Sequence, residues 1–163
     1  MTYDGIYKLI ASAESSGPEM FWEYDGQFFM LFYDRFMYTP FMDIPDIAFM
    51  YMEINNWQGM SVRCGVWQYY ESGSFQTGKF ERVLSYLRTN HEEEMASVYA
   101  YGIHDYANEK YQENYDYPEE WFDETDKIDK WISVHEQSIY QWMYDLIMNI
   151  KSDLLNLGDT EVC

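Results

Sequence analysis

The sequence TDKIDKWISVHEQSIYQWMYDLIMNIKSDL, residues 125–154, decides the fold class of this chain. Its large side chains recur every three or four residues, which is the spacing of one face of an α-helix. These side chains are Ile128, Trp131, Ile132, His135, Ile139, Trp142, Met143, Leu146, Ile147, Ile150 and Leu154. The pattern predicts one long helix that begins at Thr125 and ends at Gly158, because glycine favours helix C-termini.

Shorter stretches upstream have the same periodicity. They predict helices over residues 1–15, 46–56, 61–71, 78–90 and 91–112, and two or three short helices within residues 21–51, where glycine and proline interrupt an aromatic stretch. Residues 113–124 are expected to form an acidic loop. The sequence therefore predicts an all-α (mainly α) fold, with a single compact multi-helix domain over residues 1–157 and a long C-terminal helix. Residues 158–163 are expected to be a frayed C-terminal tail.

Composition points to a folded chain with an unusual charge. Of the 163 residues, 47% are hydrophobic and 20% are aromatic, whereas disordered chains are poor in aromatic residues. The 29 acidic residues outnumber the 10 Lys and Arg residues, so the formal net charge is −19. Such a charge repels itself and weakens the compact state. Burial of aromatic rings is the expected offset.

The sign of the charge restricts the partners. Direct binding of nucleic acid is disfavoured because it relies on basic groups that neutralise phosphates, and binding to an anionic membrane surface is disfavoured for the same reason. Basic proteins and cations are what an acidic field attracts. The alternative is that the charge serves only solubility.

Cysteine usage and hydropathy favour a soluble, cytoplasmic protein. Cys64 and Cys163 form neither a disulfide framework nor a CxxC metal pair, and this fits a reducing compartment. The first four residues lack the basic start of a signal peptide. The most apolar stretch, Phe28–Phe41, contains two charged residues and is too short to span a bilayer.

Motifs for catalysis are lacking in the sequence. It contains no phosphate-binding glycine loop, no HExxH and no GxSxG. The three histidines, His91, His104 and His135, do not have the spacing of a metal site, and His135 is expected to be a packed, hydrogen-bonded core residue. We therefore expect no enzyme activity, no cofactor and no metal.

The most informative polar segment is residues 113–129. It contains eight acids, and Lys127 is its only basic residue. A solvated loop and helix start is one interpretation. The interleaved aromatic residues favour another, because Tyr and Trp beside carboxylates can hold Arg or Lys by cation–π and charge-assisted contacts. On this second interpretation the expected partner-binding residues are Asp116, Glu119, Glu120, Trp121, Asp123, Glu124 and Asp126.

A second surface is expected in the aromatic and methionine-rich block at residues 20–52. Core packing is the default role of such residues. The block contains more large apolar side chains than a domain of this size readily buries, so part of it is an alternative self-association face. A homodimer would also concentrate the acidic charge.

Two sequence segments resemble a known family. Glu53-Ile54-Asn55-Asn56, followed by the segment Gly65–Gly73 (GVWQYYESG), is similar to the signature of a bacterial family of DNA-mimic, transcription-factor-binding helical proteins. The resemblance covers about residues 46–106. It implies an acidic, all-helical, dimeric protein that presents carboxylates in place of phosphates. In the family Asn-Asn runs directly into a glycine pair, whereas here residues 57–64 intervene before Gly65.

These observations lead to a ranked set of functional hypotheses. The first is an acidic, non-enzymatic binding protein, a DNA mimic that occupies the basic face of a DNA-binding protein. The second is an immunity or antitoxin-type inhibitor of a toxin, and the third, which the sequence supports least, is an uncharacterised helical enzyme or metalloprotein. A lone helix with acids at i and i+4 spaces them at about 6 Å. DNA mimicry would therefore need two acidic faces or a dimer seam.

Overall fold

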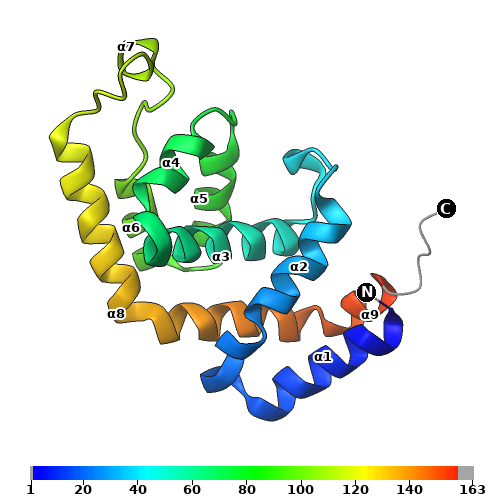
Figure 1. The fold of residues 1–163 in the computed structure, drawn as a ribbon. Helices are drawn as coiled ribbons and strands as arrows, with labels where there is room; N and C mark the ends of the chain where they lie inside the picture. Colours follow the sequence, from blue (N-terminus) through cyan, green and yellow to red (C-terminus); the bar gives the residue numbers. More distant parts are fainter. Residues whose placement is uncertain (1, 158–163) are drawn as a thin grey trace. The chain divides into compact units, whose positions relative to one another are not determined.

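The structure is a computed structural model that describes residues 2–157, apart from the side chain of Leu157. Every regular element in this range is a helix, and the predicted all-α fold class is confirmed (Figure 1). The α-helices are α1 (Tyr3–Ser16), α2 (Asp25–Phe36), α3 (Asp46–Cys64), α4 (Trp67–Gly73), α5 (Lys79–Thr89), α6 (Glu93–Tyr101), α7 (Glu109–Gln112), α8 (Glu119–Asn149) and α9 (Lys151–Leu157). Two 3-10 helices are η1 (Pro18–Glu23) and η2 (Phe41–Asp43). The predicted long C-terminal helix is α8.

The chain divides into two compact units. One unit is Pro40–His135, and the other combines Met1–Thr39 with Glu136–Cys163, so α8 contributes residues to both. The expectation of a single domain over residues 1–157 stays a prediction. The expected frayed tail at 158–163 lies outside the described residues.

The unit that contains both chain ends, which we call the terminal unit, has a core of aliphatic and aromatic side chains. α1 contributes Ile6, Leu9, Ile10 and Ala13, and α2 contributes Phe28, Leu31 and Phe32. Phe21 from η1 is fully buried, with its ring 5.6 Å from that of Phe28 and edge-on to Tyr144 of α8 at 5.7 Å. α1 packs against α9, and Lys151 bonds Glu14 at 2.7 Å between these helices. Helix α9 therefore completes the terminal unit by packing against α1.

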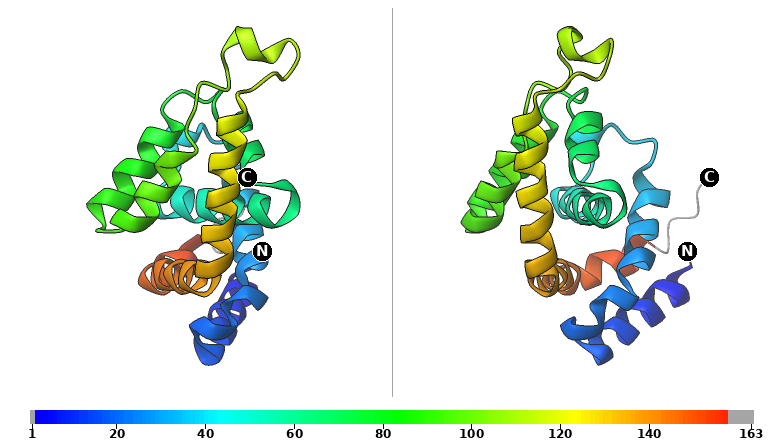
Figure 2. Two further views of the ribbon diagram at one scale, coloured as in Figure 1. Left: turned by 90° about the vertical axis from the view of Figure 1, so that its left-hand side faces the viewer. Right: turned by 60° about the vertical axis from the view of Figure 1, so that its left-hand side comes forward.

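The unit of residues 40–135, which we call the central unit, is built around α3. This helix buries Phe49, Met50, Tyr51, Ile54 and Trp57 and packs against α4 and α5. α5 and α6 lie side by side (Figure 2). The side chain of Arg82 on α5 donates hydrogen bonds to the carbonyl oxygens of Phe41 and Ile44 and pairs with Asp46 at 2.6 Å. Arg82 thereby fixes the segment that leads into α3.

Two boundaries in the middle of the chain differ from the sequence prediction. The helix predicted over 46–56 continues to Cys64, because Trp57 and Gln58 are buried and extend its packed face. The helix predicted over 61–71 is wrong: Gly65, at φ 91°, ends α3, and α4 begins at Trp67. The backbone N–H of Val66 in this corner donates to Asp129 of α8 at 3.0 Å. A tertiary contact therefore helps to hold the turn in place.

Two further boundaries also differ. The helix predicted over 91–112 is interrupted, since α6 ends at Tyr101 and only the short α7 follows. The segment predicted as a loop up to residue 124 is helical from Glu119, because α8 starts directly after Pro118. Pro is well suited to helix N-termini, and acids in the first turn complement the helix dipole. At its other end α8 stops at Asn149, and α9 follows separately.

Gly102 tests how tightly the central unit is packed. A Cβ atom at Gly102 would collide with the Tyr70 ring, which is fully buried. Gly102→Ala should lower the free energy of unfolding by about 1–3 kcal/mol through overpacking. Urea denaturation followed by far-ultraviolet circular dichroism measures this change.

Gly59→Ala is the matched control in the same unit. A Cβ at Gly59 meets only the flexible end of Arg63, at 3.3 Å, and alanine favours the helix interior. The control variant should be as stable as the wild type or slightly more stable. Equal loss of stability in both variants would contradict the packing argument.

Candidate functional site

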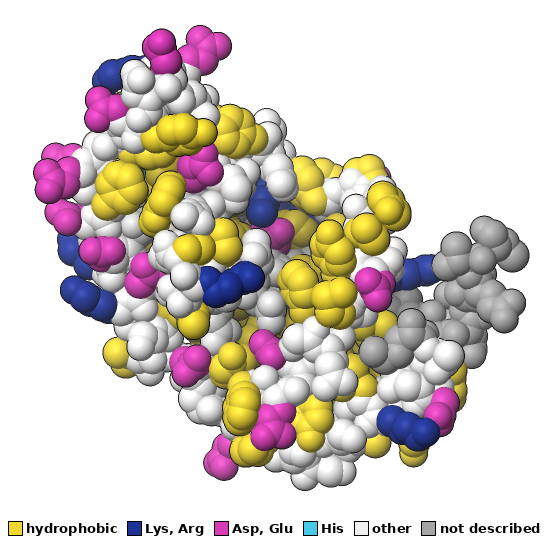
Figure 3. Space-filling view, in the orientation of Figure 1, with side chains coloured by type: hydrophobic (Ala, Val, Ile, Leu, Met, Phe, Trp, Pro, Cys, Tyr) yellow, Lys and Arg dark blue, Asp and Glu magenta, His cyan; other side chains and the backbone are white. Residues whose placement is uncertain are grey.

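Five of the seven expected partner-binding residues are exposed and form one segment of the central unit. They are Asp116, Glu119, Glu120, Asp123 and Asp126. Figure 3 shows Asp and Glu side chains over the region of α7 and the first turns of α8. We call this set of five residues the acidic face.

Helix geometry orders part of the acidic face. Glu119, Asp123 and Asp126 are at i, i+4 and i+7, so they line up on one side of α8. The opposite side buries Thr125, Ile128 and Ile132. The next position on the exposed line is Lys130, which ends the run of acids after two turns.

Trp121 lies beneath the acidic face rather than on it. Its indole stacks on the imidazole of His104, with ring centroids 4.6 Å apart and planes 4° from parallel. The rings of Tyr106, Tyr111 and Tyr117 surround it at 5.0, 5.2 and 6.0 Å. The half-buried indole therefore joins the start of α8 to α7 and to the loops on either side of α7, and its contacts are largely within the protein.

Glu124 also turns inward. Its Oε2 atom lies 2.6 Å from Nε2 of His104, and the two side chains are 24% and 20% exposed. Beside them the hydroxyl of Tyr106 is buried without a hydrogen-bond partner among the described residues. Burial and the nearby Glu124 carboxylate raise the pKa of Tyr106, so this hydroxyl stays protonated. Glu124 thus anchors α8 to the loop after α6.

A second group of acids comes from the start of α6. Glu93 and Glu94 are exposed in its first turn. The indole N–H of Trp131 on α8 donates to Glu94 at 3.0 Å, and His135 Nε2 lies 3.7 Å from the same oxygen. His135 is half-buried and hydrogen-bonded to the Trp131 carbonyl, so it is not the core residue that was expected. α6 and α8 therefore present acids from two neighbouring helices.

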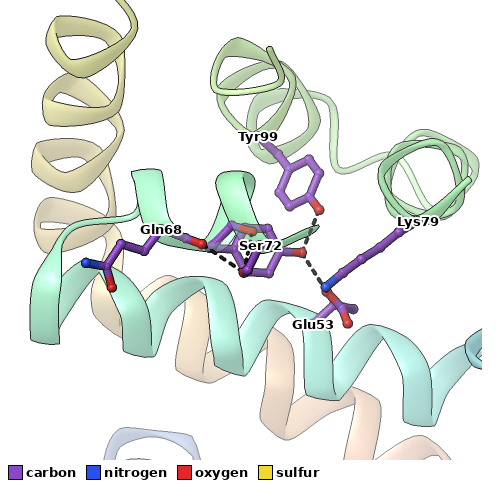
Figure 4. Close-up of polar contacts among 6 residues, drawn as sticks. Glu53, Gln68, Ser72, Lys79 and Tyr99 are labelled. Atoms are coloured by element: carbon purple, nitrogen blue, oxygen red, sulfur yellow. Dashed lines mark hydrogen bonds and ion pairs between the residues drawn. The ribbon is translucent and has the colours of Figure 1, made fainter. Parts of the chain in front are cut away.

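Sequence reasoning missed a buried polar network in the central unit (Figure 4). Tyr69 donates its hydroxyl proton to Glu53 at 2.7 Å, and its oxygen lies 2.6 Å from the Tyr99 hydroxyl oxygen. Lys79 pairs with the same Glu53 oxygen at 2.9 Å. The ammonium group of Lys79 also lies 4.9 Å from the centre of the Tyr69 ring. The network joins α3, α4, α5 and α6.

Tyr70 extends this polar core. It accepts a hydrogen bond from the indole of Trp57 at 2.8 Å and donates to the carbonyl oxygen of Tyr99 at 2.9 Å. Burial raises the pKa of the Tyr69, Tyr70 and Tyr99 hydroxyls well above the ordinary value. Nearby Glu53 raises the pKa of Tyr69 further. These hydroxyls therefore act as neutral hydrogen-bonding groups.

The residues of the quoted motif meet in this network. Glu53 comes from its first segment, and Tyr69 and Tyr70 come from its second. Gly65 permits the corner between the two segments, and Gly73 has no room for a side chain beside the ring of Phe80, 2.7 Å from a Cβ placed there. The Tyr-Tyr pair belongs to the same quoted segment as Gly65 and Gly73, so its place in this helix corner could be recognised from the sequence. Its partners on α5 and α6 could not, because no local pattern links them.

Within residues 2–157 the structure bears on two further features, metal ligands and membrane spans. This range contains no group of three or more His, Cys, Asp or Glu side chains that could hold a metal ion. None of its helices combines the length and the apolar composition needed to cross a bilayer.

Trp121 is expected to matter for stability. Trp121→Ala should lower the free energy of unfolding by about 2–4 kcal/mol, because a large, partly buried ring loses its contacts with four neighbouring rings. Glu120→Ala, at the exposed neighbouring position, should change it by less than about 0.5 kcal/mol. Chemical denaturation of both variants measures the difference, and an unchanged stability for Trp121→Ala would contradict the burial seen here.

The raised pKa values of the buried tyrosines allow us to predict how the stability of the protein changes at alkaline pH. Because their pKa values are raised in the folded state, the stability they provide is complete below about pH 10, the ordinary tyrosine pKa. It is lost as the pH rises toward the higher folded-state values. Tyrosinate absorbance from the buried tyrosines should therefore appear only together with loss of helical circular dichroism.

Tyr99→Phe tests this assignment. It should reduce the tyrosinate absorbance that appears together with the loss of helical circular dichroism. Ionisation of all tyrosines near pH 10 with unchanged circular dichroism would contradict the assignment.

Comparison with known proteins leaves the family open. The chain matches no protein-family model, no curated protein and no solved structure. The resemblance to DNA-mimic proteins therefore stays a prediction that rests on the motif residues alone.

Proposed function

We propose that the protein is a non-enzymatic binding protein whose acidic face occupies the basic, nucleic-acid-binding surface of another protein, as a DNA mimic. The observation that carries the proposal is the acidic face itself. Its five exposed carboxylates lie within eleven residues of a segment, 113–129, that contains a single lysine. A basic partner surface would be attracted to it and oriented by it.

The packing beneath the acidic face supports the proposal. Trp121 and Glu124 are held by His104 and by surrounding tyrosines, so the first turns of α8 have a fixed support. A preorganised set of charges loses less conformational entropy on binding than mobile side chains on a loop. The acids are therefore better placed for recognition than they would be in the solvated loop that the sequence suggested.

The spacing of the acids is also compatible with mimicry. The line Glu119–Asp123–Asp126 rises about 10 Å along α8, which is sparse beside duplex DNA with one charge per about 1.7 Å. Glu93 and Glu94 on the neighbouring α6 add a second group. A partner would therefore have to contact acids from both helices, of which Glu94 lies beside Trp131 and His135.

The same surface would suit an inhibitor of a basic toxin. Both hypotheses depend on the same carboxylates, and they differ only in the partner. The behaviour of the captured protein toward duplex DNA separates the two hypotheses.

The test is affinity capture from native lysate at low salt with a triple variant, Glu119→Gln, Asp123→Asn and Asp126→Asn. The wild type should retain a basic protein at about 50 mM salt and release it by about 0.5 M, because the screening length falls from about 14 Å to about 4 Å. The triple variant should retain at least about tenfold less, since it loses the central line of the acidic face.

The matched control removes the same charge elsewhere. Glu19→Gln, Glu23→Gln and Glu136→Gln are exposed positions of the terminal unit, and this variant should capture the partner as well as the wild type. A DNA mimic further requires that duplex DNA displaces the captured protein. A partner that is an enzyme inhibited by the chain but not displaced by DNA would favour the toxin inhibitor, and equal capture by both triple variants would refute a specific acidic face.

A further inference from the structure

Helix α2 in the terminal unit has apolar side chains on two opposite faces. Phe28, Leu31 and Phe32 point into the core. Met30 and Tyr33, together with Met37 directly after the last residue of α2, lie on the far side, at i, i+3 and i+7, and they are 49%, 44% and 45% exposed. A surface helix ordinarily carries polar residues on its outer side, and a helix that is apolar all round is ordinarily buried. The outer side of α2 is therefore more apolar than the solvent-facing side of a helix ordinarily is.

This outer surface also contains a charge. Asp34, one turn after Met30, is exposed among the apolar side chains and takes part in no ion pair within the described range. Arg35 is rotated about 100° around the helix axis from Asp34. The surface formed by Met30, Tyr33, Asp34 and Met37, which we call the α2 face, thus combines apolar contact area with one carboxylate.

The negative charge of the terminal unit indicates which kind of partner the α2 face would bind. Residues 1–39 contain six acids and two basic residues, and residues 136–163 contain five acids and one basic residue. A second copy of this chain would bring two such acidic units together, and their repulsion would oppose the contact. A basic partner is attracted by the same field.

We propose that the α2 face is a docking surface for an amphipathic helix of another protein, one that carries Lys or Arg beside its apolar stripe. This inference is independent of the proposed function, because it uses a different unit and a different set of residues.

The chemistry of the α2 face fits such a helix. Methionine side chains are flexible and polarisable, so they adapt to varied apolar partners. The ring of Tyr33, stacked on Phe29 with centroids 6.0 Å apart, offers a face to a cation, and Asp34 offers a carboxylate. The line from Met30 to Met37 rises about 10 Å, which matches two turns of a partner helix packed ridge into groove.

The test is titration of the full-length protein with a labelled synthetic peptide of about 18 residues. The peptide has Leu at i, i+3, i+4 and i+7 and Lys on the flanking positions, and fluorescence anisotropy measures its binding. It should bind the wild type about tenfold more tightly than a peptide of the same composition in scrambled order, because only the ordered peptide has an apolar face. A peptide with Glu in place of Lys should not bind.

Variants locate the binding surface. Met30→Gln with Met37→Gln should weaken binding about tenfold, and Asp34→Asn should weaken it less and make it less sensitive to salt. The control, Met42→Gln with Val62→Gln, changes two exposed apolar residues of the central unit, 60% and 73% exposed, and should bind like the wild type.

Four outcomes would overturn the inference. They are absence of peptide binding, equal binding of the ordered and scrambled peptides, unchanged binding by the Met30/Met37 variant, and loss of binding in the Glu119/Asp123/Asp126 variant. A wild type that sediments as a dimer, while the Met30/Met37 variant sediments as a monomer, would also overturn it, since the α2 face would then bind a second copy.

Discussion

Electrostatic repulsion among 29 acidic side chains opposes the compaction of this chain, and the remaining features of the structure depend on how that repulsion is offset. The largest fully buried side chains are mostly aromatic, among them Trp57, Tyr51, Tyr69, Tyr70 and Tyr99. Each large ring removes roughly 150–250 Å² from water. Burial of these rings in the core can therefore offset the repulsion among the acidic side chains, most of which remain on the surface.

An interior rich in tyrosine brings hydroxyl groups with it, and these must be hydrogen-bonded when they are buried. The hydroxyls of Tyr69, Tyr70 and Tyr99 are paired with one another, with Glu53 and with a backbone carbonyl, whereas the Tyr106 hydroxyl has no partner among the described residues. Glu53 in turn needs Lys79, because an isolated carboxylate would be costly at this depth. The network ties four helices together by directional contacts, and it specifies their pairing more narrowly than apolar packing alone.

The acidic face and the α2 face differ in how much charge contributes to their expected binding. The acidic face, on α8 and the loop before it, consists of carboxylates, so salt should govern its interactions. The α2 face has a single carboxylate among methionine and tyrosine side chains, so apolar contact should contribute most of its affinity and charge should select the partner. Each belongs to a different unit.

Local patterns in the sequence determined the helical fold class, because the buried face of a helix of three turns or more appears in the periodicity of its own residues. The long helix was predicted from the recurrence of Ile128, Ile132 and Ile139. Helix α5 was predicted from Phe80, Val83 and Leu87. The exposed acids Glu119, Asp123 and Asp126 were also recognisable, since charge is a local property. Only the tertiary structure decided that α3 runs through Trp57, that Trp121 and Glu124 turn inward to His104, and that Glu53 meets Tyr69 and Lys79. Those outcomes depend on side chains brought together from distant helices, and sequence periodicity contains no information about which helices become neighbours.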